Sequence, residues 1–276
     1  MSVLTDLPDL LKRGVRRFNV PGAALAVYRR GRVYEAAAGV LNVDTRVTVT
    51  TDSVFQIGSI SKIFTTTLIM QLVDEGLLDL DAPVCDYLPG FAVADGTVSR
   101  SVTPRHFLTH SSGIEGDFFV DSGRGDDSVA RLQDMGTMLP NLFPPGERLS
   151  YCNFGFAMLG RIIEVLTGLT WDRAMRERLF EPLGMEHALT LPEETVKFRA
   201  AIGHVPNPTR RSENMITPMP WLFFGQKAAG TTPTMSAADL LKFAAMHLDR
   251  GTTKSGERIL SRQSVRQMQQ PQMRLP

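Results

Sequence analysis

The chain of 276 residues carries 30 Lys and Arg against 29 Asp and Glu, a formal net charge of +1. This balance argues against a binder of nucleic acid or of anionic membranes, since both need a basic surplus to neutralise phosphates. With 43% hydrophobic and 21% charged residues, the composition is that of an ordinary globular protein and excludes a disordered chain.

Cysteine usage and the N-terminus indicate the compartment. Cys85 and Cys152 are too few and too far apart to form a disulfide framework or a four-ligand zinc site. The first residues include Asp6 and Asp9 and lack the continuous apolar segment of a secretory signal, and no apolar run is long enough to span a membrane. We therefore expect a soluble, cytoplasmic protein with neither nucleic-acid nor membrane partners.

The N-terminal part predicts a helix followed by a hairpin. Residues 4–18 place leucines near helical spacing. Two short apolar runs, Ala23–Tyr28 and Val33–Ala38, then flank a tight connection in which Gly31 supplies a positive φ. Because a lone hairpin is marginal in water, we expect further strands or covering helices to complete this sheet.

The rest of the chain is mostly helical by pattern. The predicted helices run from Ser59 to near Gly76, over 103–109, from Phe156 to Gly168, over 170–180, from a capping box at Ser236 and Asp239 to about His247, and over 261–269. Residues 77–101 are rich in Pro, Gly and Asp and predict a loop, and the pattern over 189–234 is irregular.

The sharpest chemical feature is the motif Ser59-Ile60-Ser61-Lys62 at a predicted helix start. Ser59 and Lys62 are three residues apart, so they share one helix face and are separated by about 4.5 Å along the axis. A Lys whose pKa is lowered by burial is able to take the Ser proton, and N–H groups of a first helical turn stabilise an oxyanion. Taken by itself, the pattern more commonly marks a helix cap followed by a solvated Lys.

A second candidate, Tyr151-Cys152-Asn153, follows a Pro-Pro-Gly turn and precedes a strong helix. A Tyr hydroxyl beside a Lys ammonium ionises more readily and is then a general base. An Asn amide holds a substrate carbonyl or the Lys itself. The alternative is that Tyr151 is a half-buried anchor and Asn153 a helix N-cap.

Two histidines, His106 and His110, have the i, i+4 spacing of a metal pair, but no Glu lies between them and no third ligand is near in the sequence. We expect His106 on the surface and His110 to fix its loop by a hydrogen bond, without a metal. The spacing of the histidines leaves a Ser-His-Asp triad open, although Ser59 does not lie in a G-x-S-x-G elbow.

The S-x-x-K and Y-x-N motifs, in this order, resemble those of the serine β-lactamases and penicillin-binding proteins. The resemblance extends over nearly the whole chain through the blocks FQIGSISKIFTTTLIMQLVDEGLLDLDAPV, VTPRHFLTHSSGI, FPPGERLSYCNFGFAMLGRIIEVLTG, LFEPLGM and KAAGTTPTMSAADLLKFAAMHL. The chain is thus similar to the β-lactamase-related serine hydrolases, which include class C β-lactamases, D-alanyl-D-alanine carboxypeptidases, family VIII-like esterases and some peptide cyclases and acyltransferases.

This resemblance implies an α+β fold, with a helical lobe on an antiparallel-sheet lobe. Residues 1–58 and 186–276 would form the sheet-containing lobe and 59–185 the mainly helical lobe, within one structural domain.

The resemblance also implies a role for each candidate residue. Ser59 would be the nucleophile that forms an acyl-enzyme, and its own N–H one oxyanion donor. Lys62 and Tyr151 would pass the Ser59 proton to the leaving group, and Asn153 would orient the substrate. No metal or organic cofactor is implied.

The chain departs from the family at its third motif, a Lys-Thr-Gly or His-x-Gly strand that supplies the second oxyanion donor. The weak look-alike at Lys227 lies in the block before Ser236, so we do not expect it to take that role. Family chains usually continue for many tens of residues past the block resembling ILSRQSVRQM. We therefore expect an incomplete sheet lobe, nearly inactive by itself unless a C-terminal segment or a second chain completes the sheet.

We expect a serine hydrolase that acts on an ester, amide or β-lactam-like group of a small molecule or peptide. The alternatives are an acyltransferase or peptide cyclase of the same fold, and a catalytically incomplete fragment or binding module. Loops 115–140 and 206–226 are expected to shape the pocket. Their aromatic residues line an acyl pocket or cover the helical core: Phe118, Phe119, Trp221, Phe223 and Phe224.

Overall fold

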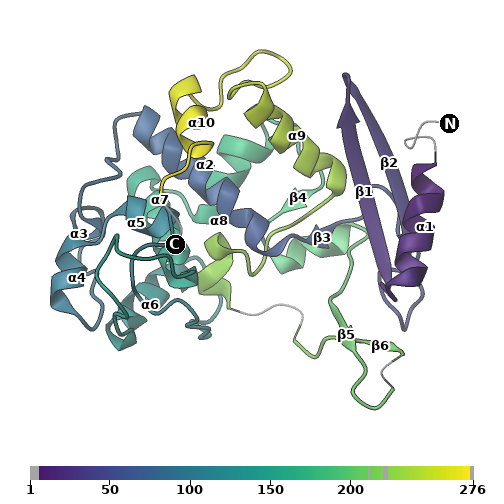
Figure 1. The fold of residues 1–276 in the computed structure, drawn as a ribbon, viewed down its shortest axis with the longest axis horizontal. Helices are drawn as coiled ribbons and strands as arrows, with labels where there is room; N and C mark the ends of the chain where they lie inside the picture. The colour runs from purple at the N-terminus through teal and green to yellow at the C-terminus, as the bar shows by residue number, and fades with distance from the viewer. Residues whose placement is uncertain (1–5, 211, 220–222, 274–276) are drawn as a thin grey trace. The chain divides into compact units, whose positions relative to one another are not determined.

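The computed structural model describes residues 6–210, 212–219 and 223–273. The helices, in chain order, are α1 (Leu7–Arg17), α2 (Ser61–Asp74), α3 (Val84–Tyr87), α4 (Gly96–Ser101), α5 (Pro104–Leu108), α6 (Ser128–Asp134), α7 (Asn153–Thr167), α8 (Trp171–Met175), α9 (Ala237–Leu248) and α10 (Arg262–Met268) (Figure 1). The strands are β1 (Gly22–Arg29), β2 (Arg32–Gly39), β3 (Phe55–Gln56), β4 (Ala188–Leu189), β5 (His204–Pro206), β6 (Asn214–Ile216) and β7 (Thr234–Met235). Helices combined with small antiparallel sheets make the predicted α+β class.

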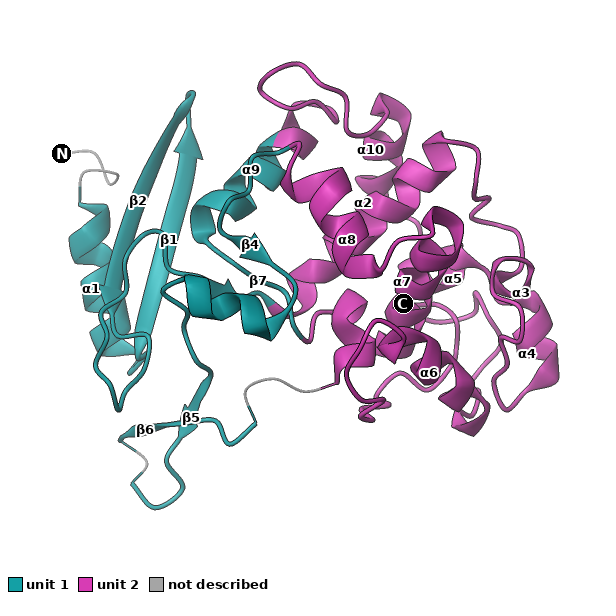
Figure 2. Ribbon diagram, turned by 180° about the vertical axis from the view of Figure 1, so that it is seen from behind, with its two compact units in different colours: residues 1–57, 183–221, 232–245 teal, residues 58–182, 222–231, 246–276 magenta. Residues whose placement is uncertain are grey.

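The chain divides into two compact units, coloured separately in Figure 2. The first contains residues 1–57, 183–221 and 232–245, and the second contains residues 58–182, 222–231 and 246–276. The resemblance implies that the last two of these segments lie in the sheet-containing lobe, and that division into lobes stays a prediction. Within the second unit, one side-chain bond joins each of them to a helix: Gln71 of α2 donates to the Ile259 carbonyl at 3.0 Å, and Lys227 pairs with Asp172 of α8.

In the first unit, the N-terminal hairpin is formed as predicted. β1 and β2 pair antiparallel from Gly22 opposite Gly39 to Arg29 opposite Arg32. The two residues between the strands both have positive φ, 49° at Arg30 and 79° at Gly31, which is the geometry of a tight hairpin turn. Helix α1 packs along this pair of strands, so it covers part of the hairpin's apolar surface (Figure 1).

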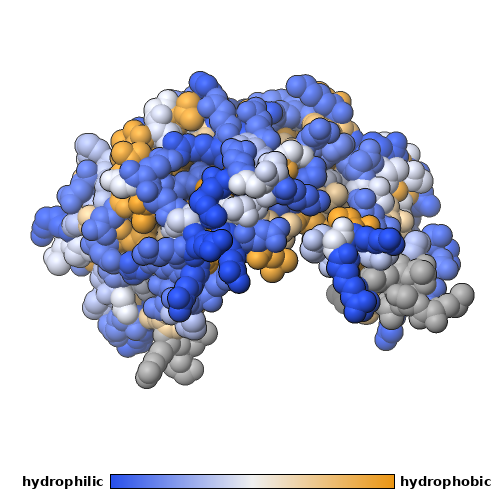
Figure 3. Space-filling model, turned by 90° about the horizontal axis from the view of Figure 1, so that it is seen from above, coloured by the Kyte–Doolittle hydropathy of each residue, from blue (hydrophilic) through white to orange (hydrophobic). Residues whose placement is uncertain are grey.

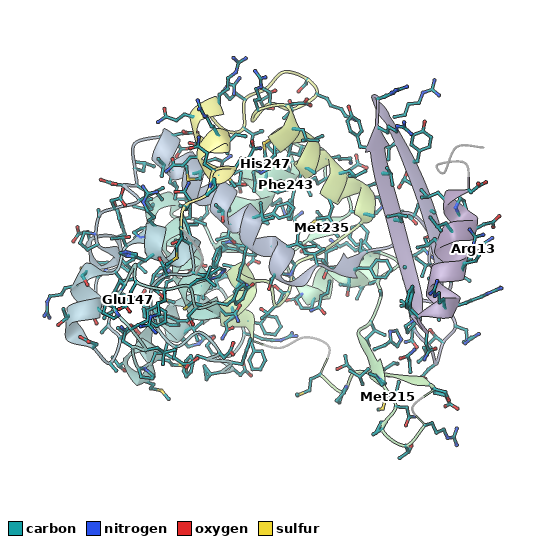
Figure 4. The ribbon with its side chains drawn as sticks, viewed as in Figure 1. Arg13, Glu147, Met215, Met235, Phe243 and His247 are labelled. Atoms are coloured by element: carbon teal, nitrogen blue, oxygen red, sulfur yellow. The ribbon has the colours of Figure 1, made fainter. Side chains whose placement is uncertain are left out.

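The first unit also contains short strands that the sequence pattern did not reveal. β7 is the central strand of a three-stranded antiparallel sheet with β3 and β4, and β5 pairs with β6. Strands of two or three residues are too short to show a period of two. Met235 of β7 and Phe243 of α9, labelled in Figure 4, are both buried in the apolar core.

Only half of the predicted capping box before α9 is formed. The Asp239 N–H donates to Ser236 Oγ at 3.2 Å, as a capping Ser requires. The Asp239 carboxylate, however, accepts the N–H of His187 at 2.6 Å, and the Ser236 N–H donates to the His187 carbonyl. Asp239 thus links the start of α9 to the segment before β4.

The second unit is built around α2 and α7, whose residues are mostly buried. α7 ends at Gly168 with a φ of 69°, as predicted. The residue that caps its start is Cys152, whose sulfur accepts the Gly155 N–H at 3.3 Å, and Asn153 is the first helical residue. The predicted loop over 77–101 is wrong in part, because α3 and α4 lie within it; Asp95 caps α4 through the Thr97 N–H at 2.7 Å.

Within the described residues, no single helix has the length and apolar character to cross a membrane; one pair, α7 with Trp171–Phe180, passes on length and composition together but is bent by 81°. On the face drawn in Figure 3, hydrophilic residues predominate and hydrophobic residues form small separate groups.

Candidate active site

Ser59 lies in a single 3-10 turn, Gly58–Ile60, that leads directly into α2. Ser59 is exposed. Ser61, two positions later, is buried and donates from Oγ to the Gly58 carbonyl at 2.7 Å. Gly58 has a φ of 53°, a conformation that glycine adopts at little cost. The turn therefore leaves Ser59 accessible, while the Ser61 hydroxyl is bonded within the turn.

Lys62, in the first turn of α2, is buried, with 5% of its surface exposed. Its Nζ donates to Ser59 Oγ at 3.2 Å, to Asn153 Oδ1 at 2.9 Å and to the Ala229 carbonyl at 2.6 Å. These bonds use all three N–H groups of an ammonium. The contact between Ser59 and Lys62 is the one that their helical spacing predicts. Asn153 bonds to Lys62, which is one of the two partners considered for its amide.

The electrostatics of Lys62 combine burial with aromatic contacts. Burial lowers the pKa of Lys62 below its ordinary value of 10.5, and the neighbouring Tyr151 opposes this effect. Nζ lies 4.7 Å from the centroid of the Tyr151 ring and 5.5 Å from that of Phe156. An amine with a lowered pKa is more often neutral near pH 7, as a general base must be.

Tyr151 is exposed over 45% of its surface and stacks on His110, with ring centroids 4.2 Å apart and an interplanar angle of 26°. His110 Nδ1 accepts the N–H of Cys152 at 3.1 Å, so His110 fixes the loop that carries Tyr151, as predicted. Burial and the charge of Lys62 lower the pKa of His110 to about 4. Near pH 7 the ring is therefore neutral, which an accepting Nδ1 requires.

His106 differs from its prediction as a surface residue, because it is half-buried and caps a helix. Its Nδ1 accepts the Thr103 N–H at 3.1 Å, and the Thr103 hydroxyl accepts the His106 N–H at 3.4 Å. No cluster of three or more His, Cys, Asp or Glu suited to a metal occurs among the residues described.

Gly230 is a site residue that the motifs did not identify. Its φ is +117°, and a Cβ added there would lie 2.3 Å from the Gly58 carbonyl oxygen and 3.0 Å from the Ser59 nitrogen. Real Cβ atoms essentially never approach another atom as closely as the first of these contacts. Gly230 therefore allows the chain to pass directly beside the backbone of Ser59. Its positive φ and the close contact are invisible in a sequence without a structure.

Lys227, the look-alike of a third motif, is buried to 2% exposure and pairs with Asp172. Its ammonium is therefore directed at a carboxylate of the core. The sequence offered no sign of this partner, since Lys227 and Asp172 are 55 positions apart.

The predicted pocket aromatics fall into different settings. Phe119 and Phe223 contact each other with ring centroids 5.7 Å apart, and Phe119 is 51% exposed. Phe224 is buried beneath the guanidinium of Arg124, 4.5 Å from its ring centroid, and so covers the core. Phe118 accepts through its carbonyl from Gln226 Nε2, and Trp221 lies outside the described residues.

Comparison with known proteins gives a consistent set of relatives. The family model described as Beta-lactamase matches residues 7–276. Penicillin-binding protein 4 of Amycolatopsis lactamdurans is 50% identical over 254 residues, which cover 91% of this chain and 66% of that protein.

Two solved structures are similar over almost the whole chain. The octameric penicillin-binding protein homologue from Pyrococcus abyssi has a TM-score of 0.82 and 29% identity, covering 100% of this chain and 62% of that one. SurE with D-Leu has a TM-score of 0.75 and 32% identity, covering 95% of this chain and 56% of that one. The chain thus spans between 56% and 66% of the length of these relatives.

Proposed function

Because the chain belongs to the beta-lactamase family, we propose that it is a serine hydrolase that forms an acyl-enzyme on Ser59. The observation that carries this proposal is the placement of Lys62 Nζ 3.2 Å from Ser59 Oγ, with two further acceptors fixing the amine. The hydroxyl of an exposed serine in contact with a buried amine is the pairing of an activated nucleophile with its base.

The two fixed acceptors give the neutral amine a direction. A neutral Lys62 has two N–H groups and one lone pair. When Asn153 Oδ1 and the Ala229 carbonyl accept those two N–H groups, the lone pair is left toward Ser59 Oγ. The Ser59 O–H then donates to Nζ, and its proton moves to the amine as Oγ forms its bond to the acyl carbon.

The negative charge that develops on the acyl oxygen is stabilised by backbone N–H groups at the start of α2. The first N–H groups of a helix have no intrahelical partner, so the Ser59 N–H is an oxyanion donor. Tyr151, whose ring lies against the protonated amine, passes the proton on to the leaving group, and a water molecule then releases the acyl group. Asn153 has a second task in this scheme, since its amide N–H₂ is a donor for a substrate carbonyl.

The substrate class follows from the chemistry and from the relatives. An acyl-enzyme on Ser59 accepts an ester, an amide or a strained β-lactam as its donor. SurE has been solved with D-Leu and another relative is a penicillin-binding protein, which favours acyl donors derived from D-amino acids. Water as the acceptor gives hydrolysis, and an amine in its place gives acyl transfer on the same intermediate.

The test is covalent labelling with a fluorophosphonate and with a fluorescent penicillin, followed by mass spectrometry of the intact protein. We expect one adduct on the wild-type protein, even at the slow rate expected of an incomplete sheet lobe. Ser59→Ala should give none, since loss of a nucleophile removes several powers of ten in rate. Ser101→Ala, which removes a serine at the end of α4, is the matched control and should label normally. An unlabelled wild-type protein, or a Ser59→Ala variant that still labels, would contradict the proposal.

A further inference from the structure

A buried ion pair lies beside the candidate site. Lys227, in the 3-10 segment Phe224–Ala229, donates to Asp172 Oδ2 in the first turn of α8, and the two side chains are 3% and 11% exposed. Within the part of the chain that the structure describes, the other oxygen of this carboxylate, Oδ1, is buried without a hydrogen-bond partner. A desolvated ion pair in which one carboxylate oxygen has no hydrogen-bond partner stabilises the fold only weakly. The pair therefore calls for an explanation other than stability.

The segment that carries Lys227 also holds one face of α2. The Thr65 hydroxyl donates to the Ala228 carbonyl at 2.8 Å, and Lys62 Nζ donates to the Ala229 carbonyl at 2.6 Å. Lys62 and Thr65 are three residues apart and share a face of the helix. The carbonyls one and two residues after Lys227 are therefore the groups against which the candidate base is fixed.

The partner of Lys227 is itself anchored to α7. Glu164 of α7 accepts the Trp171 N–H at 3.2 Å, which ties the start of α8 to that helix next to Asp172. Gly160, one turn earlier on α7, leaves room for Ala228, because a Cβ there would lie 2.5 Å from the Ala228 Cβ. The position of Asp172 is therefore set by the packing of α8 against α7, and a charge-assisted bond to Asp172 holds Lys227 in place.

We propose that the Lys227–Asp172 pair is a positioning device that holds the Ala229 carbonyl against Lys62 and so keeps the amine aimed at Ser59. The inference rests on the proposed function of Lys62 as the base. Neither member of the pair touches a reacting atom, so both are positioning residues. Losing the pair leaves Ser59, Lys62 and Asn153 in the protein but frees the carbonyl that directs the lone pair.

The test replaces both charges at once, as Lys227→Met with Asp172→Leu. Removing one partner would strand a buried charge, whereas an apolar pair of similar volume is often neutral or stabilising. A milder second variant, Lys227→Gln with Asp172→Asn, keeps a neutral hydrogen bond. Val98→Ala on α4 is the stability control, because Val98 is buried in the same unit outside the site. Each protein is labelled with the fluorophosphonate, and the maximal acylation rate constant, the apparent affinity for the probe and the Tm are measured.

We expect the apolar double variant to keep its Tm and its probe affinity and to lose about tenfold or more in the maximal acylation rate constant, as a misplaced catalytic group does. The milder variant should lose less. An unchanged acylation rate constant in the apolar double variant would overturn the proposal. It would also be overturned if the double variant lost no more of its rate constant than Val98→Ala does for the same decrease in Tm. Failure of both double variants to fold would also overturn it, because the pair would then serve the whole fold rather than one carbonyl.

A second readout separates this proposal from the proposed function. If the wild-type protein is not labelled at Ser59, the proposed function fails. The positioning role is then tested without catalysis, by NMR of the Lys62 amine in protein whose lysines carry ¹⁵N at Nζ. The Lys62 signal is assigned as the one that Lys62→Met lacks. The protons of this amine should exchange with water about tenfold faster in the apolar double variant, because one of their three acceptors is released. Equal exchange in both proteins would overturn the positioning role without reference to catalysis.

Discussion

The Lys62 Nζ lies over the ring of Tyr151, 4.7 Å from its centroid. A ring face at this distance stabilises an ammonium. The two residues therefore act on the same proton, because the ring of Tyr151 stabilises the ammonium that Lys62 would form on taking the Ser59 proton. Their roles in proton transfer are coupled rather than separate.

This coupling predicts that Lys62→Met and Tyr151→Phe are non-additive. Each should lower the rate of Ser59 acylation by about 10² to 10⁴, the usual contribution of a general base. The double variant should be no slower than the slower single variant, since both residues serve one proton transfer. Labelling kinetics measure the rates, and Tyr87→Phe on α3 is the matched control. Multiplied effects in the double variant would assign the two residues to independent steps.

The pH dependence of acylation should follow Lys62. The base is active when deprotonated, so the rate rises with pH as the amine loses its proton. Because burial lowers the pKa of Lys62, the midpoint of this rise should lie below 10.5, the ordinary value for Lys. Labelling rates between pH 5 and pH 10 measure the midpoint, and the rise attributable to Lys62 should be absent from Lys62→Met. The same rise in both proteins would rule out Lys62 as the titrating group.

The sequence predicts well those features that depend on a long periodic pattern or on residues close together in the chain. The helix ending at Gly168 is apolar over four turns, and the contact of Ser59 with Lys62 follows from a spacing of three. The Ala229 carbonyl was missed because a backbone acceptor leaves no mark in the sequence. Lys227 was considered only as a motif look-alike, since its partner Asp172 is distant along the chain. The short helix α4 was missed because six residues show no clear period.

Gly230→Ala should disable the site through the backbone of the nucleophile. The new Cβ would meet the Gly58 carbonyl oxygen at 2.3 Å, so the turn that carries Ser59 has to shift. We expect a loss of about 10² or more in acylation rate, together with about 1–3 kcal/mol of strain in stability. Gly168→Ala is the matched control, because its φ is also positive but no atom lies within 4 Å of the new Cβ. Equal labelling of the two variants would show that the close approach at Ser59 is unimportant.

Stability toward acid should depend on His110. The pKa of His110 is lowered to about 4 in the folded protein by burial and by the charge of Lys62, against 6.5 for an ordinary His. Between these values the unfolded chain binds a proton that the folded protein does not, so the free energy of unfolding falls as the pH drops from about 6.5 to about 4. The full shift corresponds to about 3 kcal/mol, an order-of-magnitude figure.

His110→Asn removes this titration with little change of local structure. An Asn oxygen is able to accept the Cys152 N–H in place of Nδ1, and Asn tolerates the positive φ of 55° at this position. Urea unfolding at pH 7 and pH 4.5 should show that the wild-type protein loses about 2–3 kcal/mol more than the variant over this interval. Loss of the ring stacked on Tyr151 affects both pH values alike and cancels in the comparison. His106, His204 and His247 also have lowered pKa values and remain in both proteins, so the acid limb of the variant should be flatter rather than flat. Equal losses in the two proteins would mean that His110 binds its proton as readily when folded as when unfolded.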